Sequence, residues 1–263
     1  MDYKTLLVDQ DDAGIVWITL NRPERLNALS TELMLELTDL VTRISEDDAV
    51  RVFVIRATGR GFGAGADLKE QYAHAHDFPV FGRYIMKCMR GLQVAINTSP
   101  KVSIAAVHGM ALAGSLELMM TCDLAIATED ARLSDQHANY GLPPVGSATQ
   151  RLPRIVGLRK ALELLMTGMS LTGKEAAAIN LVNRAVPAEQ FETATREFAQ
   201  SIAEKSPMVT ALIKDLVYGG IQADFTTAMT LEKWGGYASG SWQDVREGIA
   251  AFNEKRRPEY RNR

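Results

Sequence analysis

The spacing of hydrophobic residues changes several times along this chain, and each change predicts a different element. Residues 14–21 (GIVWITLN) and 51–59 (RVFVIRATG) are short runs rich in β-branched residues, which is typical of buried strands. Between them, Ser30 opens a segment at 31–47 whose apolar residues recur with helical spacing, so we expect an amphipathic helix there. The next expected elements are a helix at 81–97, a strand at 101–109, a helix at 115–123 and two short strands within 124–134. Strands that alternate with helices indicate an α/β fold in which helices cover the faces of a sheet.

From Arg154 onward the pattern becomes one helix after another. The expected helical segments are 157–168, 172–180, 189–206, 207–220 and 241–260. No linker rich in glycine, serine or proline separates them from the preceding strands. We therefore expect a continuous body with a helical C-terminal third.

Composition limits the classes of partner. A chain of 263 residues with 46% hydrophobic residues can bury a full core. The formal net charge is −3, from 29 lysines and arginines against 32 acidic residues, so no overall basic field attracts nucleic acid or an anionic membrane. No apolar run is long enough to span a membrane, and the first residues are acidic where a secretory signal is basic. We expect a soluble, cytoplasmic protein.

One carboxylate, Glu117, lies inside the otherwise apolar segment HGMALAGSLELMM (108–120). Two interpretations are open: the side chain turns to solvent, as most helical glutamates do, or it occupies a partly desolvated pocket. The small residues of 111–114 and of GFGAGAD (61–67) allow a ligand to approach backbone N–H groups. Two such donors from separate loops can stabilise a developing oxyanion. The glycine spacing matches neither a P-loop nor a dinucleotide-binding fingerprint.

The remaining residues of possible chemical interest have simpler interpretations. Cys88 and Cys122 lie in apolar segments without disulfide or metal-site spacing, so we expect buried, reduced thiols. His74 and His76 alternate like metal ligands, but two histidines without further ligands are better interpreted as solvated loop residues. We expect no metal site.

Five segments, in their order and spacing, resemble the crotonase family, also called the enoyl-CoA hydratase/isomerase family. They are NRPERLNALS (21–30), GRGFGAGADLKE (59–70), KVSIAAVHGMALAGSLELMMTCDLAIATEDARLS (101–134), GLPPVGSATQRLPRIVG (141–157) and REGIAAFNEKRRPEY (246–260). The resemblance implies an α/β fold, a crotonase-like spiral of repeated β-β-α units with a C-terminal helical trimerisation region. We expect the acyl-CoA-binding spiral core at 1–195, and the helical region, which also forms part of the CoA site, at 196–263.

The resemblance also implies the catalytic groups. The backbone N–H groups of Ala66 and Gly114 match the two oxyanion-hole donors that hold the thioester oxygen. Glu117 matches the first of two glutamates that position the added water in family hydratases. The second glutamate position holds His137, in DQHANYG (135–141), where the family has a segment like QPEINLG. A glutamate and a histidine can divide the acid and base work, although a purely space-filling role for His137 stays open.

Contacts to coenzyme A follow from the same resemblance, with CoA as part of the substrate and no tightly bound cofactor. The residues expected to border the pantetheine and the nucleotide are Arg25, Leu26, Ala64, Asp67 and Leu68. Lys255 and Arg256 match basic residues that approach the CoA phosphates, in some cases from a neighbouring subunit; a solvated basic tail is the alternative.

Several positions depart from the family pattern. Gly63 stands where cysteine or serine is common, and Ser115 and Leu116 stand where the family often has glycine and cysteine. Val145 and Ser147 occupy glycine positions beside the acyl chain. We therefore expect a reshaped pocket, so the acyl group cannot be inherited from common family members.

The expected function is that of an enoyl-CoA hydratase-like lyase of fatty acid metabolism, assembled as a homotrimer or hexamer. A first alternative is a C–C bond or thioester hydrolase that uses His137, although the supporting acid of such enzymes of the 6-oxocamphor hydrolase type would fall near Gly146. A second alternative is a non-catalytic acyl-CoA-binding subunit. An isomerase is disfavoured because family isomerases rely on the carboxylate position that His137 occupies.

Overall fold

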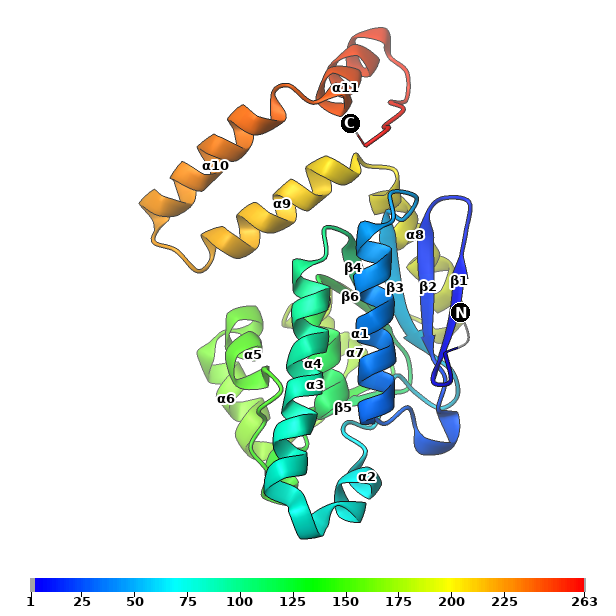
Figure 1. Cartoon of the computed structure of the whole chain (residues 1–263), viewed down its shortest axis with the longest axis vertical. Coiled ribbons are helices and arrows are strands. Elements are labelled where there is room, and N and C mark those ends of the chain that lie inside the picture. Colours follow the sequence, from blue (N-terminus) through cyan, green and yellow to red (C-terminus); the bar gives the residue numbers. More distant parts are fainter. Residues whose placement is uncertain (1–2, 263) are drawn as a thin grey trace.

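The computed structural model describes residues 3–262, except for the side chain of Phe78. Within this part of the chain, six strands form one sheet in the order β1-β2-β3-β4-β6-β9 (Figure 1). They are β1 (Leu6–Gln10), β2 (Ile15–Leu20), β3 (Val52–Ala57), β4 (Val102–Val107), β6 (Leu124–Thr128) and β9 (Arg184–Val186). β1 and β2 are antiparallel, and all other neighbours are parallel. Parallel neighbours require crossover connections, here through helices, so the predicted α/β fold is confirmed.

The sheet is covered by helices on both faces. Successive residues of a strand point to opposite faces, and in β2 Ile18 packs in one hydrophobic cluster while Trp17 packs in a second. Helices α1 (Thr31–Glu46) and α3 (Phe78–Thr98) contribute to the first cluster, and α8 (Phe191–Ala203) contributes to the second (Figure 1). Every residue of β2 is therefore buried, which explains its continuous apolar run.

A smaller sheet lies beside the first. Within residues 3–262 it contains three strands in the order β5-β7-β8, namely β5 (Met110–Leu112), β7 (Arg132–Ser134) and β8 (Leu171–Thr172). The chain passes from β4 to β5 and then into α4 (Gly114–Thr121), and later from β6 to β7. Strands of the two sheets thus alternate along the chain, which agrees with the expected β-β-α repetition. The shorter helices that complete this body are α2 (Leu68–Ala73), α5 (Ala148–Val156), α6 (Leu158–Thr167) and α7 (Gly173–Ala178).

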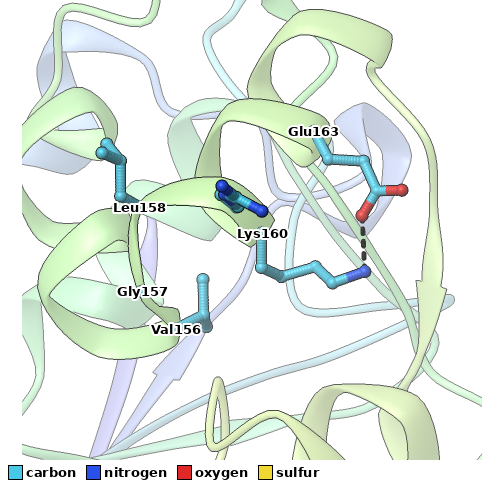
Figure 2. A pocket seen from close by; sticks show the side chains of 6 residues that line it. Val156, Gly157, Leu158, Lys160 and Glu163 are labelled. Atoms are coloured by element: carbon cyan, nitrogen blue, oxygen red, sulfur yellow. Dashed lines mark hydrogen bonds and ion pairs between the residues drawn. The ribbon is translucent and has the colours of Figure 1, made fainter.

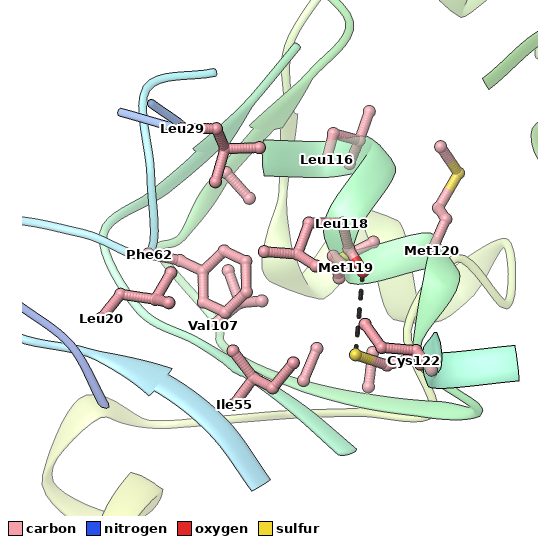
Figure 3. Packing of buried hydrophobic residues seen from close by; sticks show 14 of the residues in the cluster. Leu20, Leu29, Ile55, Phe62, Val107, Leu116, Leu118, Met119, Met120 and Cys122 are labelled. Carbon is pink, nitrogen blue, oxygen red and sulfur yellow. Dashed lines mark hydrogen bonds between the residues drawn. The ribbon is translucent and has the colours of Figure 1, made fainter. Parts of the chain in front are cut away.

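Helix α4 is the central helix of the molecule. All of its residues are buried, and Leu118 and Met119 belong to the same cluster as Phe62 and Val107 (Figure 3). The helix is apolar on all sides, which is the pattern of a helix surrounded by protein. Its position is therefore fixed by packing, and so is the position of the one carboxylate it carries.

The last three helices extend away from the sheet, as Figure 1 shows: α9 (Pro207–Gly220), α10 (Phe225–Ser239) and α11 (Gln243–Glu254). Lys214 anchors α9, because its buried ammonium donates to the carbonyl oxygens of Ile96 and Lys101 and contacts the Asp123 carboxylate at 3.0 Å. Tyr218 donates a second hydrogen bond to Asp123. No helix among the described residues combines the length and apolarity required to cross a membrane.

Several elements lie outside the sequence predictions, among them β1, α2, β5, α5, β8, β9 and α10. β1 is an edge strand in which only Leu6 is buried, so no apolar run reveals it. α10 buries only Gly235 within the single chain, and no apolar stripe facing a core marks it. The expected boundary between 195 and 196 falls inside α8, which packs on the sheet; the division into two regions stays a prediction.

Candidate active site

A cavity of about 500 Å³ lies between α3, α4 and the segment that follows β7. Most of its wall is apolar, including Met34, Ile85 and Met89. The polar side chains that line it are Gln71, Glu117, Arg132, Gln136, His137 and Tyr140. An apolar cavity with a few convergent polar groups is the usual form of a small-molecule site. Eight of the residues singled out in the sequence line it: Ala64, Ala66, Leu68, Gly114, Glu117, His137, Val145 and Gly146.

The backbone N–H groups of Ala66 and Gly114 lie close together on the cavity wall. A Cβ atom placed on Gly114 would lie 3.4 Å from the Ala66 nitrogen. Gly65 O and Asp67 N both bond to Leu29, so the N–H of Ala66 between them points to the opposite side. Gly114 is the first residue of α4, where N–H groups have no intrahelical acceptor. Neither amide has an acceptor within residues 3–262, so both can bind a ligand oxygen.

Close backbone contacts hold the two donor loops against each other. Gly65 has φ +101°, and a Cβ there would lie 3.0 Å from the Cβ of Ala113. Ala113 itself has φ 45° and ψ −119°, a strained conformation for a residue with a side chain. Ser115 accepts a hydrogen bond from Gly65 N at 3.0 Å, and its Oγ fills the space where a Cβ on Gly63 would stand. The glycine at 63 and the serine at 115 are therefore complementary.

Glu117 is buried in the cavity wall, and only 2% of its surface is exposed. Its Oε1 accepts a hydrogen bond from the backbone N–H of Ala148 at 3.0 Å. Burial raises the pKa of this carboxyl, and the N–H of Ala148 and the nearby His137 oppose that rise only in part. Gly146 packs directly on the carboxylate: a Cβ there would lie 2.8 Å from Glu117 Cδ. Of the two open interpretations of Glu117, the structure has the pocket carboxylate.

His137 lies across the same cavity in a short 3₁₀ turn (His137–Tyr140). Its Nδ1 lies 2.9 Å from Oδ1 of Asp135, which is 1% exposed. Within residues 3–262, Nε2 has no hydrogen-bond partner. Burial lowers the pKa of His137, but the hydrogen bond and charge of Asp135 and the charge of Glu117 outweigh it, so the pKa lies above its ordinary value.

Asp135 is the functional candidate that sequence reasoning missed. The sequence analysis places the acid that supports a histidine near Gly146, which instead packs on Glu117. The signal was the spacing of Asp135 and His137 in SDQH, since an aspartate two residues before a histidine can turn back to its ring. The structure thus supplies the missing acid from a different position.

The residues expected to contact CoA are only partly brought together. Ala64 and Leu68 line the cavity. Asp67 is buried, caps α2 and forms an ion pair with Arg22 at 2.9 Å. Burial raises the pKa of Asp67, but its hydrogen bonds with Arg22 and with the N–H of Glu70 outweigh this effect, so the pKa lies below its ordinary value. Arg25 is exposed and lines a separate hollow that also includes Asp67. Leu26 is half-buried and accepts a hydrogen bond from the N–H of Ala64.

Lys255 and Arg256 do not reach this cavity within the single chain. Both are exposed beyond the end of α11, at the far end of the C-terminal helices (Figure 1). Arg256 forms ion pairs with Glu247 and Glu254, whose carboxylates raise its pKa. Neither residue lines the cavity in the single chain, so their expected contact with CoA stays a prediction.

A second hollow, of about 630 Å³, lies at the junction of α5 and α6 (Figure 2). Six residues of one helix junction line it, between Val156 and Glu163. Its charged side chains include Lys160 and Glu163, which pair with each other (Figure 2). Its lining residues include no nucleophile and no pair of acids, so the smaller cavity with Glu117 is the better candidate site.

The other side chains considered in the sequence analysis have structural partners. Cys88 and Cys122 are free and buried, as expected, and burial raises the pKa of the Cys122 thiol to about 12. His74 stacks on Phe81, with ring centroids 3.9 Å apart. Among the described residues no group of three or more His, Cys, Asp or Glu side chains is arranged to hold a metal ion.

Comparison with known proteins agrees with this geometry. Residues 10–263 match the family model described as enoyl-CoA hydratase/isomerase. The chain belongs to the enoyl-CoA hydratase/isomerase family. The resemblance to the crotonase superfamily and the crotonase-like fold are thereby confirmed.

Relatives of this family align along nearly the whole chain. The chain is 32% identical over 265 residues to a crotonyl-CoA hydratase of Syntrophomonas wolfei, with 99% of each chain covered. It is 38% identical over 256 residues to the human mitochondrial enoyl-CoA hydratase domain-containing protein 2, covering 95% of this chain and 86% of that protein. The crystal structure of an enoyl-CoA hydratase from Bacillus anthracis superposes with a TM-score of 0.94 at 35% identity, covering 99% and 100% of the two chains.

Proposed function

We propose that this protein adds water across the double bond of a 2-enoyl-CoA thioester. The observation that carries the proposal is the convergence, in one apolar cavity, of the free N–H groups of Ala66 and Gly114 with the side chains of Glu117 and His137. The hydratases named among the relatives support the same reaction. CoA enters as part of the substrate, and no step requires a second cofactor.

The two amides polarise the substrate. With the thioester oxygen between Ala66 N and Gly114 N, negative charge that develops on this oxygen is stabilised by donors already in place. Withdrawal of electrons toward the oxygen leaves the β-carbon electrophilic and makes the α-carbon the site of protonation. Loss of one such donor in comparable sites costs about 3–4 kcal/mol of transition-state stabilisation.

Glu117 and His137 then divide the acid and base work. Glu117 takes a proton from water as the water oxygen bonds to the β-carbon, and His137 gives a proton from Nε2 to the α-carbon. One water is consumed, its hydroxyl ends on one carbon, and a hydrogen ends on the next. Transfer of the proton from Glu117 to His137 restores both groups. The pKa of Glu117, raised by burial, suits a base near neutral pH.

Purified protein mixed with crotonyl-CoA and a panel of longer, branched and aromatic enoyl-CoAs tests the proposal. Loss of the conjugated thioester absorbance, together with a product heavier by one water and still attached to CoA, supports hydration. Binding of these thioesters without any turnover would refute hydration and favour a non-catalytic acyl-CoA-binding subunit.

One observation favours a second candidate function, a C–C bond or thioester hydrolase of the same family. The buried pair of Asp135 and His137 is the kind of acid-supported histidine that activates a water for attack on a carbonyl carbon. The two functions differ in their products. Release of free CoA or cleavage of a β-keto thioester, with enoyl-CoA left unchanged, supports the hydrolase.

We further propose a trimer, or a hexamer built from two trimers, assembled through the C-terminal helices. The support is the exposed aromatic surface of α10 and α11, formed by Phe225, Trp234, Tyr237 and Phe252. In such an assembly Lys255 and Arg256 of a neighbouring copy would approach the CoA phosphates. Light scattering that reports a monomer would contradict this assembly. The cytoplasmic location stays a prediction.

A further inference from the structure

Asp135 is a buried carboxylate and, in the part of the chain that the structure describes, His137 is its only ionisable hydrogen-bond partner. Its Oδ1 accepts from the ring Nδ1 at 2.9 Å and from the backbone N–H of His137 at 3.1 Å. Its Oδ2 is buried without a hydrogen-bond partner in the part of the chain that the structure describes. No lysine or arginine of the described residues pairs with Asp135. A buried carboxylate left in this way is costly unless a nearby cation compensates it.

Among residues 3–262, the cation placed to compensate this charge is the imidazolium form of His137. A proton on Nδ1 lets the ring donate to Oδ1, and this assigns the tautomer through the hydrogen bond. With Nδ1 occupied by Asp135, the nitrogen left for the cavity is Nε2. The backbone bond to the same oxygen atom holds Asp135 and His137 in one compact turn, so the ring direction is fixed as well.

We propose that Asp135 is a positioning residue for His137: it holds Nδ1 protonated and favours the imidazolium form, in which Nε2 also carries a proton, faces the cavity and delivers that proton to the substrate. The effect of Asp135 on the reaction rate rests on the proposed function. The coupling of Asp135 to His137 does not, because it is present in the protein without substrate. Where family hydratases have a second glutamate, this chain has a histidine together with its own carboxylate.

Other charges around the ring must be considered for any dependence on pH. Glu117 faces His137 from α4, and its charge favours the imidazolium as Asp135 does. Arg132, from β7, lines the same cavity and donates to Ser170. Helix α6, which also packs against the turn of His137, carries Arg159 and the mutually paired Lys160 and Glu163. Only the carboxylates of Asp135 and Glu117 raise the pKa of His137, so removing Asp135 must lower it.

Nuclear magnetic resonance of the histidine rings in the intact protein tests this coupling without any substrate. The chain has four histidines, and His137→Gln identifies the signal of His137. We expect Nδ1 to carry the proton in neutral His137 of the wild type. Asp135→Asn should lower the titration midpoint by about one pH unit or more, which is at least about tenfold in the protonation equilibrium. Asp130→Asn, the same change in an exposed turn, should leave it in place.

Two results would overturn the proposal. One is a wild-type ring that carries its neutral proton on Nε2, which is measurable even if Asp135→Asn fails to fold. The other is an unchanged titration midpoint in folded Asp135→Asn. Neither result depends on the reaction. A protein that shows the expected coupling but does not hydrate any enoyl-CoA would refute the hydratase while supporting the role of Asp135.

Turnover provides a second, independent readout. If Asp135 acts through His137, Asp135→Asn should lower kcat by about 10²- to 10⁴-fold with little change in KM, in the range expected for a general acid. Asp135→Asn combined with His137→Gln should be no slower than His137→Gln alone. Full additivity of the two changes would contradict action through His137 and assign Asp135 an ordinary structural role.

Discussion

Gly146→Ala is a direct test of how precisely the cavity must hold Glu117. The added methyl group would lie 2.8 Å from Glu117 Cδ and closer still to Oε2, whereas ordinary contacts begin at 3.4 Å. The backbone of Gly146 is not in the left-handed region, so alanine is acceptable there except for this contact. The carboxylate must therefore retreat by roughly 1 Å, and its 3.0 Å hydrogen bond from Ala148 N–H is stretched or lost.

The expected cost can be divided between stability and rate. Overpacking of this kind costs about 1–3 kcal/mol of the free energy of unfolding. A displacement of this size at a reacting group lowers kcat by about 10²-fold. Kinetics on whichever thioester the wild type turns over, together with urea unfolding, measure the two effects separately.

Two controls make the result interpretable. Gly91→Ala adds the same methyl group to helix α3 where nothing lies within 4 Å, so it should leave kcat unchanged. In a Glu117→Ala background, Gly146→Ala should cost little unfolding free energy, because the carboxylate that the added methyl group meets is absent. A fully active Gly146→Ala enzyme would refute the view that Glu117 must stay where the structure has it.

Three further predictions concern other parts of the molecule. Glu117→Gln should abolish turnover and leave thioester affinity nearly unchanged. In the wild type, kcat/KM should fall as the pH is lowered, with a midpoint above the ordinary glutamate pKa, because Glu117 must be ionised to act as the base and burial raises its pKa. Lys214→Met should cost about 3–5 kcal/mol of unfolding free energy in a denaturant titration, because Asp123 loses its buried cation; an effect below 1 kcal/mol would contradict this. Gly63→Ser should lower the melting temperature by several degrees because its side chain meets Ser115, and an unchanged melting temperature would argue against that contact.

The sequence predicted most of the long elements that pack on the core, but it missed α5, whose Ala148 and Leu152 are buried, together with short strands and exposed elements. The continuous apolar run of β2 and the helical spacing of α1 reflect burial, and both appear where the pattern indicates. The edge strand β1 and the exposed helix α10 lack such a pattern, because within the single chain each of them buries only one residue.

The residues of the candidate site could be predicted where the residue type is unusual for its segment of the sequence. Glu117 stands out as a charge in an apolar run, and the glycines around it indicate close backbone approach. For Asp135 the sequence offers only its spacing to His137, which is ordinary in a polar turn; its burial and its contact with the ring distinguish it in the structure. Periodicity does not report which side of a turn faces a cavity.

The fit between Gly63 and Ser115 constrains the order in which this sequence can change. Serine or cysteine at 63 with glycine at 115, the residue types that the family resemblance implies, would place a side chain in a space that this chain fills with Ser115 of helix α4. Changing position 63 first gives a clash, and changing position 115 first gives a void and removes the acceptor of Gly65 N. The two arrangements are thus separate solutions, joined only through a less stable intermediate. A protein that changes from one arrangement to the other must be stable enough to tolerate the clash or the void, or must change positions 63 and 115 together.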